Sequence, residues 1–327
     1  MKSFWYISVV ILFAVFAADL LVGSAAIPVS DVLRALSGGP VDEQTRIIIT
    51  DIRLPKAITA ILAGAAVSLS GLLMQTVFRN PLAGPYVLGI SSGASLGAAV
   101  FVLGLSPLSL SGTFAGSLGL AGAAWIGSAA ILALIAFAGR KIKDIMVILI
   151  LGMMAGAAID SFVQILQYLS DEVSLKSYIV WTMGSLGTVS WNQLGFLSAA
   201  AVIGTAIAFA SSKALNLFLL GPFYAASMGL NVSRSRNVIF LSTTILAGTV
   251  TAFCGPLGFI GLAVPHLTRL MLRNADHRVL IPGTVLTGAV FMLLCDVAAK
   301  ITTLPVNAIT SLSGIPVVVW VVLKYKD

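Results

Sequence analysis

Residues 53–99 read RLPKAITAILAGAAVSLSGLLMQTVFRNPLAGPYVLGISSGASLGAA, and this segment joins a charged entry, an apolar helix and a break rich in proline and glycine. Positions 57–77 form a run of about 21 residues without a charged side chain, in which Gln75 is the strongly polar exception. At a rise of about 1.5 Å per residue, a helix of this length crosses a hydrocarbon core of about 30 Å. We therefore predict a transmembrane helix over residues 57–77.

The chain cannot continue as a regular helix beyond this run. Pro81 and Pro85 each lack a backbone donor and move the preceding residue toward extended conformations, and Gly84 loosens the backbone between them. Irregular backbone at membrane depth is tolerated only inside protein or beside a water-filled path. The break is therefore expected in one of these two places.

Glycines recur at every fourth position after the break. Gly89, Gly93 and Gly97 form one G-x-x-x-G ladder, and Gly152 with Gly156 forms another. This spacing lets helix backbones approach closely in lipid. Tight helix packing is expected at both ladders.

The composition indicates the class of protein. Hydrophobic residues make up 58% of the 327 positions and charged residues only 9%, and the mean hydropathy is +1.05, which excludes an ordinary soluble domain. Cys254 and Cys295 both lie in apolar runs, so buried thiols are expected rather than a disulfide framework. The basic residues form no continuous run, which argues against a nucleic-acid partner. We predict an all-α polytopic membrane protein.

The apolar segments predict ten transmembrane helices. The first apolar stretch has 19 residues, longer than the apolar region of a signal peptide, so a retained span is expected there. The predicted spans are residues 4–22, 57–77, the small-residue helix that ends near 99, 112–137, 145–168, 194–210, 238–254, 258–271, 279–299 and 309–323.

The distribution of basic residues predicts the orientation of these spans. Cytoplasmic loops of membrane proteins carry an excess of Lys and Arg. With both termini in the cytoplasm, only six of the 19 basic residues fall on the outer side, namely Arg34, Arg46, Arg53, Lys56, Lys176 and Lys300. We therefore predict a multi-pass protein with both termini cytoplasmic.

Several short motifs resemble those of one transport family. They are R-L-P-K at 53–56, the Gln75 helix end, N-P-L-A-x-P at 80–85, L-G-I-S-S-G-A at 88–94, G-F-I-G-L-x-x-P-H-x-x-R at 258–269, and the stretch from L-P at 304–305 to G-I-P at 314–316. Together they make the chain similar, over nearly its whole length, to the FecCD-type permeases of ABC importers. That family imports iron-siderophores, haem and cobalamin.

The resemblance implies a fold, an assembly and a set of partners. It implies one permease domain over residues 1–327, with ten helices per protomer in the type II ABC importer fold. It also implies a homodimer in the inner membrane with a central pathway, two ATPase subunits and a substrate-binding protein. The cargo would be a bulky metal chelate, and the residues do not distinguish a ferric siderophore, haem and cobalamin.

The resemblance also assigns residues to the two ends of the pathway. The cytoplasmic gate corresponds to Asn80 and Leu82, and docking of the binding protein corresponds to Arg53, Lys56 and Lys300. Lysine stands at two of these docking positions where arginine is more usual, so the charge is kept and the bidentate geometry is lost.

The stretch 213–237 contains two apolar blocks too short to span a membrane. It resembles the cytoplasmic coupling loop that such permeases insert into the ATPase, with coupling residues Gly221, Ala225, Ala226, Ser227, Met228 and Gly229. A membrane-surface helix would carry Lys and Arg along a polar face, and none occurs between Lys213 and Arg234. A protein partner is therefore expected to cover the apolar side chains, which are Leu217, Phe218, Leu219, Phe223 and Met228.

The chain carries no motif for chemistry of its own. The P-loop pattern G-x-x-x-x-G-K-[ST] does not occur, so ATP would be used by a partner subunit and no cofactor is expected in this chain. Residues 89–93 match G-x-S-x-G around Ser91, but a nucleophile elbow requires a preceding strand, which disfavours an intramembrane hydrolase. His266 and His277 form no metal cluster, and structural roles are expected for both. We predict that the chain is not an enzyme.

One predicted span carries a polar face inside the membrane. Asp160, Gln164 and Gln167 follow one another at i, i+4 and i+7, which makes them candidates for the pathway or for a polar contact between helices. The alternative function is an ion-coupled secondary transporter that uses Asp160 as its proton or cation site. Asp296 and Lys300 have the favourable i,i+4 order and are expected to form an ion pair near the outer surface.

Overall fold

The computed structural model describes residues 2–104, 114–142 and 144–324. These residues form helices joined by short connections, and no strand occurs among them. The α-helices are α1 (Lys2–Leu21), α2 (Val29–Ser37), α3 (Glu43–Ile47), α4 (Leu54–Val77), α5 (Ile90–Ala99), α6 (Phe114–Lys141), α7 (Ile145–Leu169), α8 (Glu172–Thr182), α9 (Trp191–Ala210), α10 (Ser212–Leu219), α11 (Pro222–Ser227), α12 (Val232–Thr243), α13 (Thr249–Cys254), α14 (Ile260–Leu272), α15 (His277–Thr302) and α16 (Val306–Lys324). In the described ranges these helices are continued or connected by the π-helical turns η1 (Ile48–Arg53), η3 (Val100–Gly104) and η5 (Thr244–Gly248) and by the 3-10 turn η2 (Pro85–Leu88).

The described residues contain the predicted set of membrane-spanning helices. Seven apolar helices have the length of a full span, and three shorter apolar helices accompany them at Ile90–Gly104, Ile260–Leu272 and Val306–Val321. These ten segments correspond one for one to the predicted spans, so the predicted all-α polytopic fold is confirmed. The span formed by α12 and α13 is interrupted by the π-helical turn η5. Such turns are frequent at functional sites.

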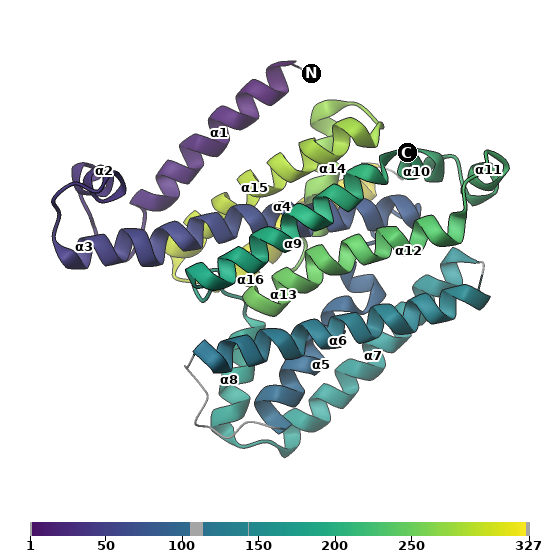
Figure 1. Cartoon of the computed structure of the whole chain (residues 1–327), viewed down its shortest axis with the longest axis horizontal. Helices are drawn as coiled ribbons and strands as arrows, with labels where there is room; N and C mark the ends of the chain where they lie inside the picture. Colours follow the sequence, from purple (N-terminus) through teal and green to yellow (C-terminus); the bar gives the residue numbers. More distant parts are fainter. Residues whose placement is uncertain (1, 105–113, 143, 325–327) are drawn as a thin grey trace.

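Helix α4 lies at the centre of the larger group of helices (Figure 1). In its most apolar window 78% of the residues are buried, a far larger share than in α7 or α1. A Cβ atom at Gly71 would overlap the backbone of Gly261 in α14, and one at Gly64 would overlap the backbone of Gly288 in α15. The missing side chains let three helix backbones meet, which supplies packing where lipid supplies no hydrophobic driving force.

The second group of helices contains α5 to α8, and α6 connects it to α13 (Figure 1). A Cβ at Gly93 would lie 2.6 Å from the Gly127 carbonyl oxygen of α6, and one at Gly97 would overlap the Ala123 carbonyl. Gly156 of α7 lies against Gly89 at the start of α5. The tight packing predicted from both glycine ladders is confirmed.

Replacing Gly93 with leucine tests this close approach. The new side chain would have to displace the backbone of α6, and overpacking of this kind costs about 1–3 kcal/mol or more. We expect Gly93→Leu to lower the unfolding temperature of the detergent-solubilised protein and to reduce its yield. Gly195→Leu on α9 is the matched control, because a Cβ at Gly195 meets nothing within 4 Å. Equal unfolding temperatures of the two variants would contradict the close α5–α6 contact.

Candidate functional site

The predicted gate residues lie in the loop that follows α4. Arg79 adopts a left-handed conformation with φ 49°, which ends the helix. The Asn80 side-chain oxygen accepts a hydrogen bond from the Leu82 backbone N–H at 2.9 Å, so the loop turns on an asparagine side chain. Leu82 is 43% exposed at the surface of the chain. The structure brings both residues into one turn, and their gating role stays a prediction.

Helix α14 contacts this loop through a histidine. The Nε2 atom of His266 lies 2.9 Å from the Pro81 carbonyl oxygen, and because a carbonyl only accepts, Nε2 carries the proton. His266 is otherwise buried. Its side chain therefore positions the gate loop against α14.

A second contact between α4 and α14 compensates for a proline. Pro265 lies inside α14 and has no N–H for the Gly261 carbonyl one turn earlier. The Gln75 amide donates to the Leu262 carbonyl at 3.2 Å and to the Gly261 carbonyl at 3.5 Å. The Gln75 oxygen in turn accepts from the Arg269 guanidinium at 2.6 Å. The polar exception in the central span thus supplies donors to an irregular neighbouring helix.

The stretch 213–237 folds into two short helices, α10 and α11, followed by the start of α12. Side chains on α11 and just after it are strongly exposed, with Phe223 at 90%, Tyr224 at 68% and Met228 at 62%. Among the predicted coupling residues, Ala226, Ser227, Met228 and Gly229 are exposed, whereas Gly221 and Ala225 are buried. The expectation that a partner covers Phe218 is wrong, because Phe218 is 3% exposed and packs into the core of this chain.

A hydrogen-bond network connects this loop to the end of α4. The side-chain oxygen of Asn216 in α10 accepts from the His277 backbone N–H at 2.9 Å and lies 2.7 Å from His277 Nδ1. The Asn216 amide donates to the Asp276 carboxylate at 2.7 Å. This hydrogen bond is the main cause that lowers the pKa of Asp276, and the hydrogen bond from the Arg278 backbone N–H is the second. The other ring nitrogen of His277, Nε2, lies 2.8 Å from the Thr76 hydroxyl. Thr76 is four residues before Asn80, so the coupling loop and the gate loop share one network.

The predicted docking residues lie at the opposite end of α4. Arg53 is only 5% exposed, and its guanidinium donates to the carbonyls of Leu20, Leu21 and Ala25. Carbonyls at a helix end lack intrahelical partners, so Arg53 caps the end of α1. Its part in docking stays a prediction, and the structure gives it a role inside the chain.

Four charged side chains form a buried cluster beside Arg53. Lys300 lies 3.0 Å from Asp296 and 2.8 Å from Asp19, and Lys56 lies 3.0 Å from Asp296. The two carboxylates are almost fully buried, Lys300 is 8% exposed and Lys56 is 23% exposed. The predicted pair of Asp296 with Lys300 is confirmed. Lys56, Asp296 and Lys300 also line an open cavity of about 330 Å³.

The polar face of α7 is open in this single chain. Asp160 and Gln164 are exposed and Gln167 is half-buried. All three lie on α7, and Gln167 hydrogen-bonds the Tyr178 hydroxyl of α8. Among the described residues, no group of three or more His, Cys, Asp or Glu could hold a metal ion.

These features describe a helical membrane protein with an irregular loop after α4 and a separate loop of exposed apolar side chains. The chain belongs to the FecCD transport family, whose model matches residues 10–324.

Similar proteins agree with this assignment. The chain is 37% identical to the hemin transport system permease HmuU of Yersinia pestis, and the match covers 85% of this chain and 83% of that protein. It is 35% identical to the molybdate import permease MolB of Haemophilus influenzae, over 89% of this chain and 85% of that protein. It is 36% identical to the vitamin B12 import permease BtuC of Salmonella typhi, over 85% and 84% of the two chains.

A solved structure supports the same fold. An inward-facing metal-chelate type ABC transporter matches with a TM-score of 0.85 and 30% identity, over 100% of both chains. The protein is thus a permease of the ABC-importer type, with the type II fold that its sequence motifs imply.

The charge cluster gives a test of which basic residues serve stability. Removing the charge of Lys300 would leave two carboxylates buried together, and breaking a buried pair in this way costs about 3–5 kcal/mol. We expect Lys300→Met to destabilise the protein strongly in thermal unfolding, and Asp19→Asn in the same chain to restore part of the loss. Lys56→Met should cost less, because Lys56 is more exposed. Unchanged stability of Lys300→Met would contradict the structural role of the cluster.

Proposed function

We propose that this permease imports a bulky metal chelate of the haem, ferric siderophore or cobalamin kind across the inner membrane. This cargo class is supported by the hemin and vitamin B12 cargoes named for HmuU and BtuC. It is also supported by the metal-chelate type transporter of similar structure. A molybdate-like oxyanion is the second candidate, which the similarity to MolB favours. Equilibrium binding of all these cargoes to the cognate binding protein would decide between them.

The observation that carries the proposal is the open polar face of α7. Asp160 lies well inside a membrane-spanning helix and is exposed in the single chain. A carboxylate exposed to hydrocarbon is costly, so such a residue faces a bundle interior or a water-filled path. A second copy of the chain placed against this face would enclose a central pathway lined by Asp160, Gln164 and Gln167.

The coupling loop supports the proposed energy source. Its exposed aromatic side chains, Phe223 and Tyr224, belong to α11. Helix α11 contacts α10, whose Asn216 belongs to the network that reaches Thr76 at the end of α4. We infer that a separate ATPase subunit covers these side chains from the cytoplasm. Movement of α10 would then change the position of the gate loop, because Asn216 and His277 connect the two.

The opposite end of the chain would receive the binding protein. Lys56 is the most exposed of the three predicted docking cations, and the cavity beside it also reaches Lys300. An acidic side chain of a binding protein could approach Lys56 without opening the buried pairs. This arrangement requires both termini in the cytoplasm, as the distribution of Lys and Arg predicts.

The energy source separates this proposal from the alternative of an ion-coupled secondary transporter using Asp160. In vesicles that contain the complete system, we expect vanadate to abolish cargo uptake and uncouplers to leave the initial rate unchanged. Uptake that is abolished by uncouplers and insensitive to vanadate would overturn the proposed function.

A charge placed on the coupling loop tests the ATPase contact. Ala226 is exposed, so Ala226→Arg adds a side chain at the surface without disturbing the buried Ala225 beneath it. An unpaired charge buried at an interface costs roughly 3 kcal/mol, which is about a hundredfold in affinity. We expect the variant to insert and dimerise normally, to lose the ATPase during purification and to lose transport-coupled hydrolysis.

Ser177→Arg on α8 is the matched control, because Ser177 is also exposed and the predicted topology puts it on the side of the membrane opposite the coupling loop. Gly229→Arg is a less clean probe, since Gly229 has a φ of 86° that strains any other residue. Wild-type copurification of the ATPase with Ala226→Arg would place the ATPase contact elsewhere on the chain.

A further inference from the structure

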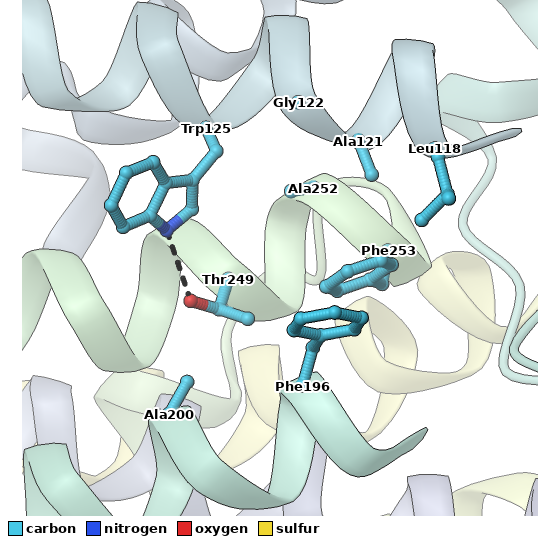
Figure 2. Close-up of a pocket in the computed structure, with 9 residues that line it drawn as sticks. All are labelled: Leu118, Ala121, Gly122, Trp125, Phe196, Ala200, Thr249, Ala252 and Phe253. Carbon is cyan, nitrogen blue, oxygen red and sulfur yellow. Dashed lines mark hydrogen bonds between the residues drawn. The ribbon is translucent and has the colours of Figure 1, made fainter. Parts of the chain in front are cut away.

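A hollow of about 300 Å³ opens on the side of the chain between α6 and α9, with α13 as its floor (Figure 2). We call it the lateral groove. Its principal lining residues are Gly122 and Trp125 of α6, Phe196 and Ala200 of α9, and Thr249 and Phe253 of α13.

The chemistry of the lateral groove is apolar. Trp125 and Thr249 are the lining residues with polar side-chain atoms, and the Trp125 indole N–H donates to the Thr249 hydroxyl at 3.2 Å (Figure 2). A stable water molecule needs two to four polar partners, and this lining directs its polar side-chain atoms at each other. The groove therefore suits a hydrocarbon rather than water or a charged ligand.

The depth of the groove matches one half of a bilayer. Helix α9 begins at Trp191, whose indole N–H donates to the Thr50 carbonyl at 3.1 Å. Phe196 and Ala200 follow five and nine residues later, which is about 7 and 14 Å along the helix axis. Half of the hydrocarbon core is about 15 Å thick. The groove thus lies in the membrane half opposite the coupling loop.

The groove opens sideways, toward lipid. Trp125 is 48% exposed and Phe196 is 63% exposed, and both belong to helices long enough to span the membrane. A Cβ at Gly122 would meet no atom within 4 Å, so the hollow reaches the surface of α6. A helix of a second protein is about 10–12 Å across and does not fit into a hollow of this volume, whereas a single flexible hydrocarbon chain does.

We propose that the lateral groove binds one acyl chain of a bilayer phospholipid. The site lies between the two groups of helices, because α6 packs on α5 of the smaller group and α9 packs on α4 of the larger one. A bound chain would fill the space between α6 and α9 above α13 and would stay with the protein longer than the lipids that exchange freely around it.

Lipid retention tests this proposal directly. We expect native mass spectrometry of the permease, purified in detergent until the freely exchanging lipids are removed, to show about one retained phospholipid per chain. Gly122→Leu and Ala200→Leu fill the groove from its two walls, and each should lower the retained fraction about tenfold. Gly195→Leu is the matched control, because it adds the same side chain to α9 at an open position outside the groove.

A second measurement locates the chain. Phosphatidylcholine with brominated acyl chains, titrated into the micelles, should quench the tryptophan fluorescence with a saturable component at about one lipid per chain. Trp125→Phe should remove this component and leave quenching of the half-exposed Trp320 on α16. Equal lipid retention in wild type and both filling variants, or quenching without saturation, would overturn the proposal. Complete protection of Trp125 from quenching by the brominated lipid would show a protein partner in the groove. This result would also overturn the proposal.

Discussion

The need to satisfy every backbone polar group inside lipid governs this structure. Pro265 lies inside α14 and leaves a carbonyl without its helical donor, and Gln75 of α4 supplies donors to that part of the helix. This exchange requires α4 and α14 to approach closely, which the contact of Gly71 with Gly261 allows. The proline inside α14 is therefore tolerated because a continuous, buried central helix lies against it.

The two ends of α4 are connected to the rest of the chain by different chemistry. At the docking end, buried ion pairs join α4 to α15 and α1 through Lys56, Asp296, Lys300 and Asp19. At the gate end, hydrogen bonds of Thr76 and its partners join α4 to the coupling loop. Buried ion pairs are costly to separate, whereas a hydrogen bond in which at most one partner is charged contributes less on its own. The end of α4 near Lys56 is therefore held by the stronger interactions of the two.

Part of the candidate site was visible along the chain. Three features are each set by residues that are neighbours in the chain: the run 57–77, the prolines after it and the exposed apolar loop. Their local composition therefore predicted a span, a break and a partner surface. Asp19 carried a weaker signal, as a lone acid at the end of an apolar span that needs a buried partner. Its partner Lys300 lies 281 residues away in the chain. A local sequence pattern cannot predict a contact at this separation.

Periodicity and composition were therefore sufficient for the ten spans, the glycine contacts and the i,i+4 pair of Asp296 with Lys300, because lipid imposes length and polarity on each helix separately. The fold alone decided that Arg53 caps α1, that Phe218 is buried, and that Asn216 and His277 connect the coupling loop to the gate end of α4. These contacts join residues that are distant in the chain. Which polar group meets which partner depends on how the helices cross, and that is a property of their packing in three dimensions.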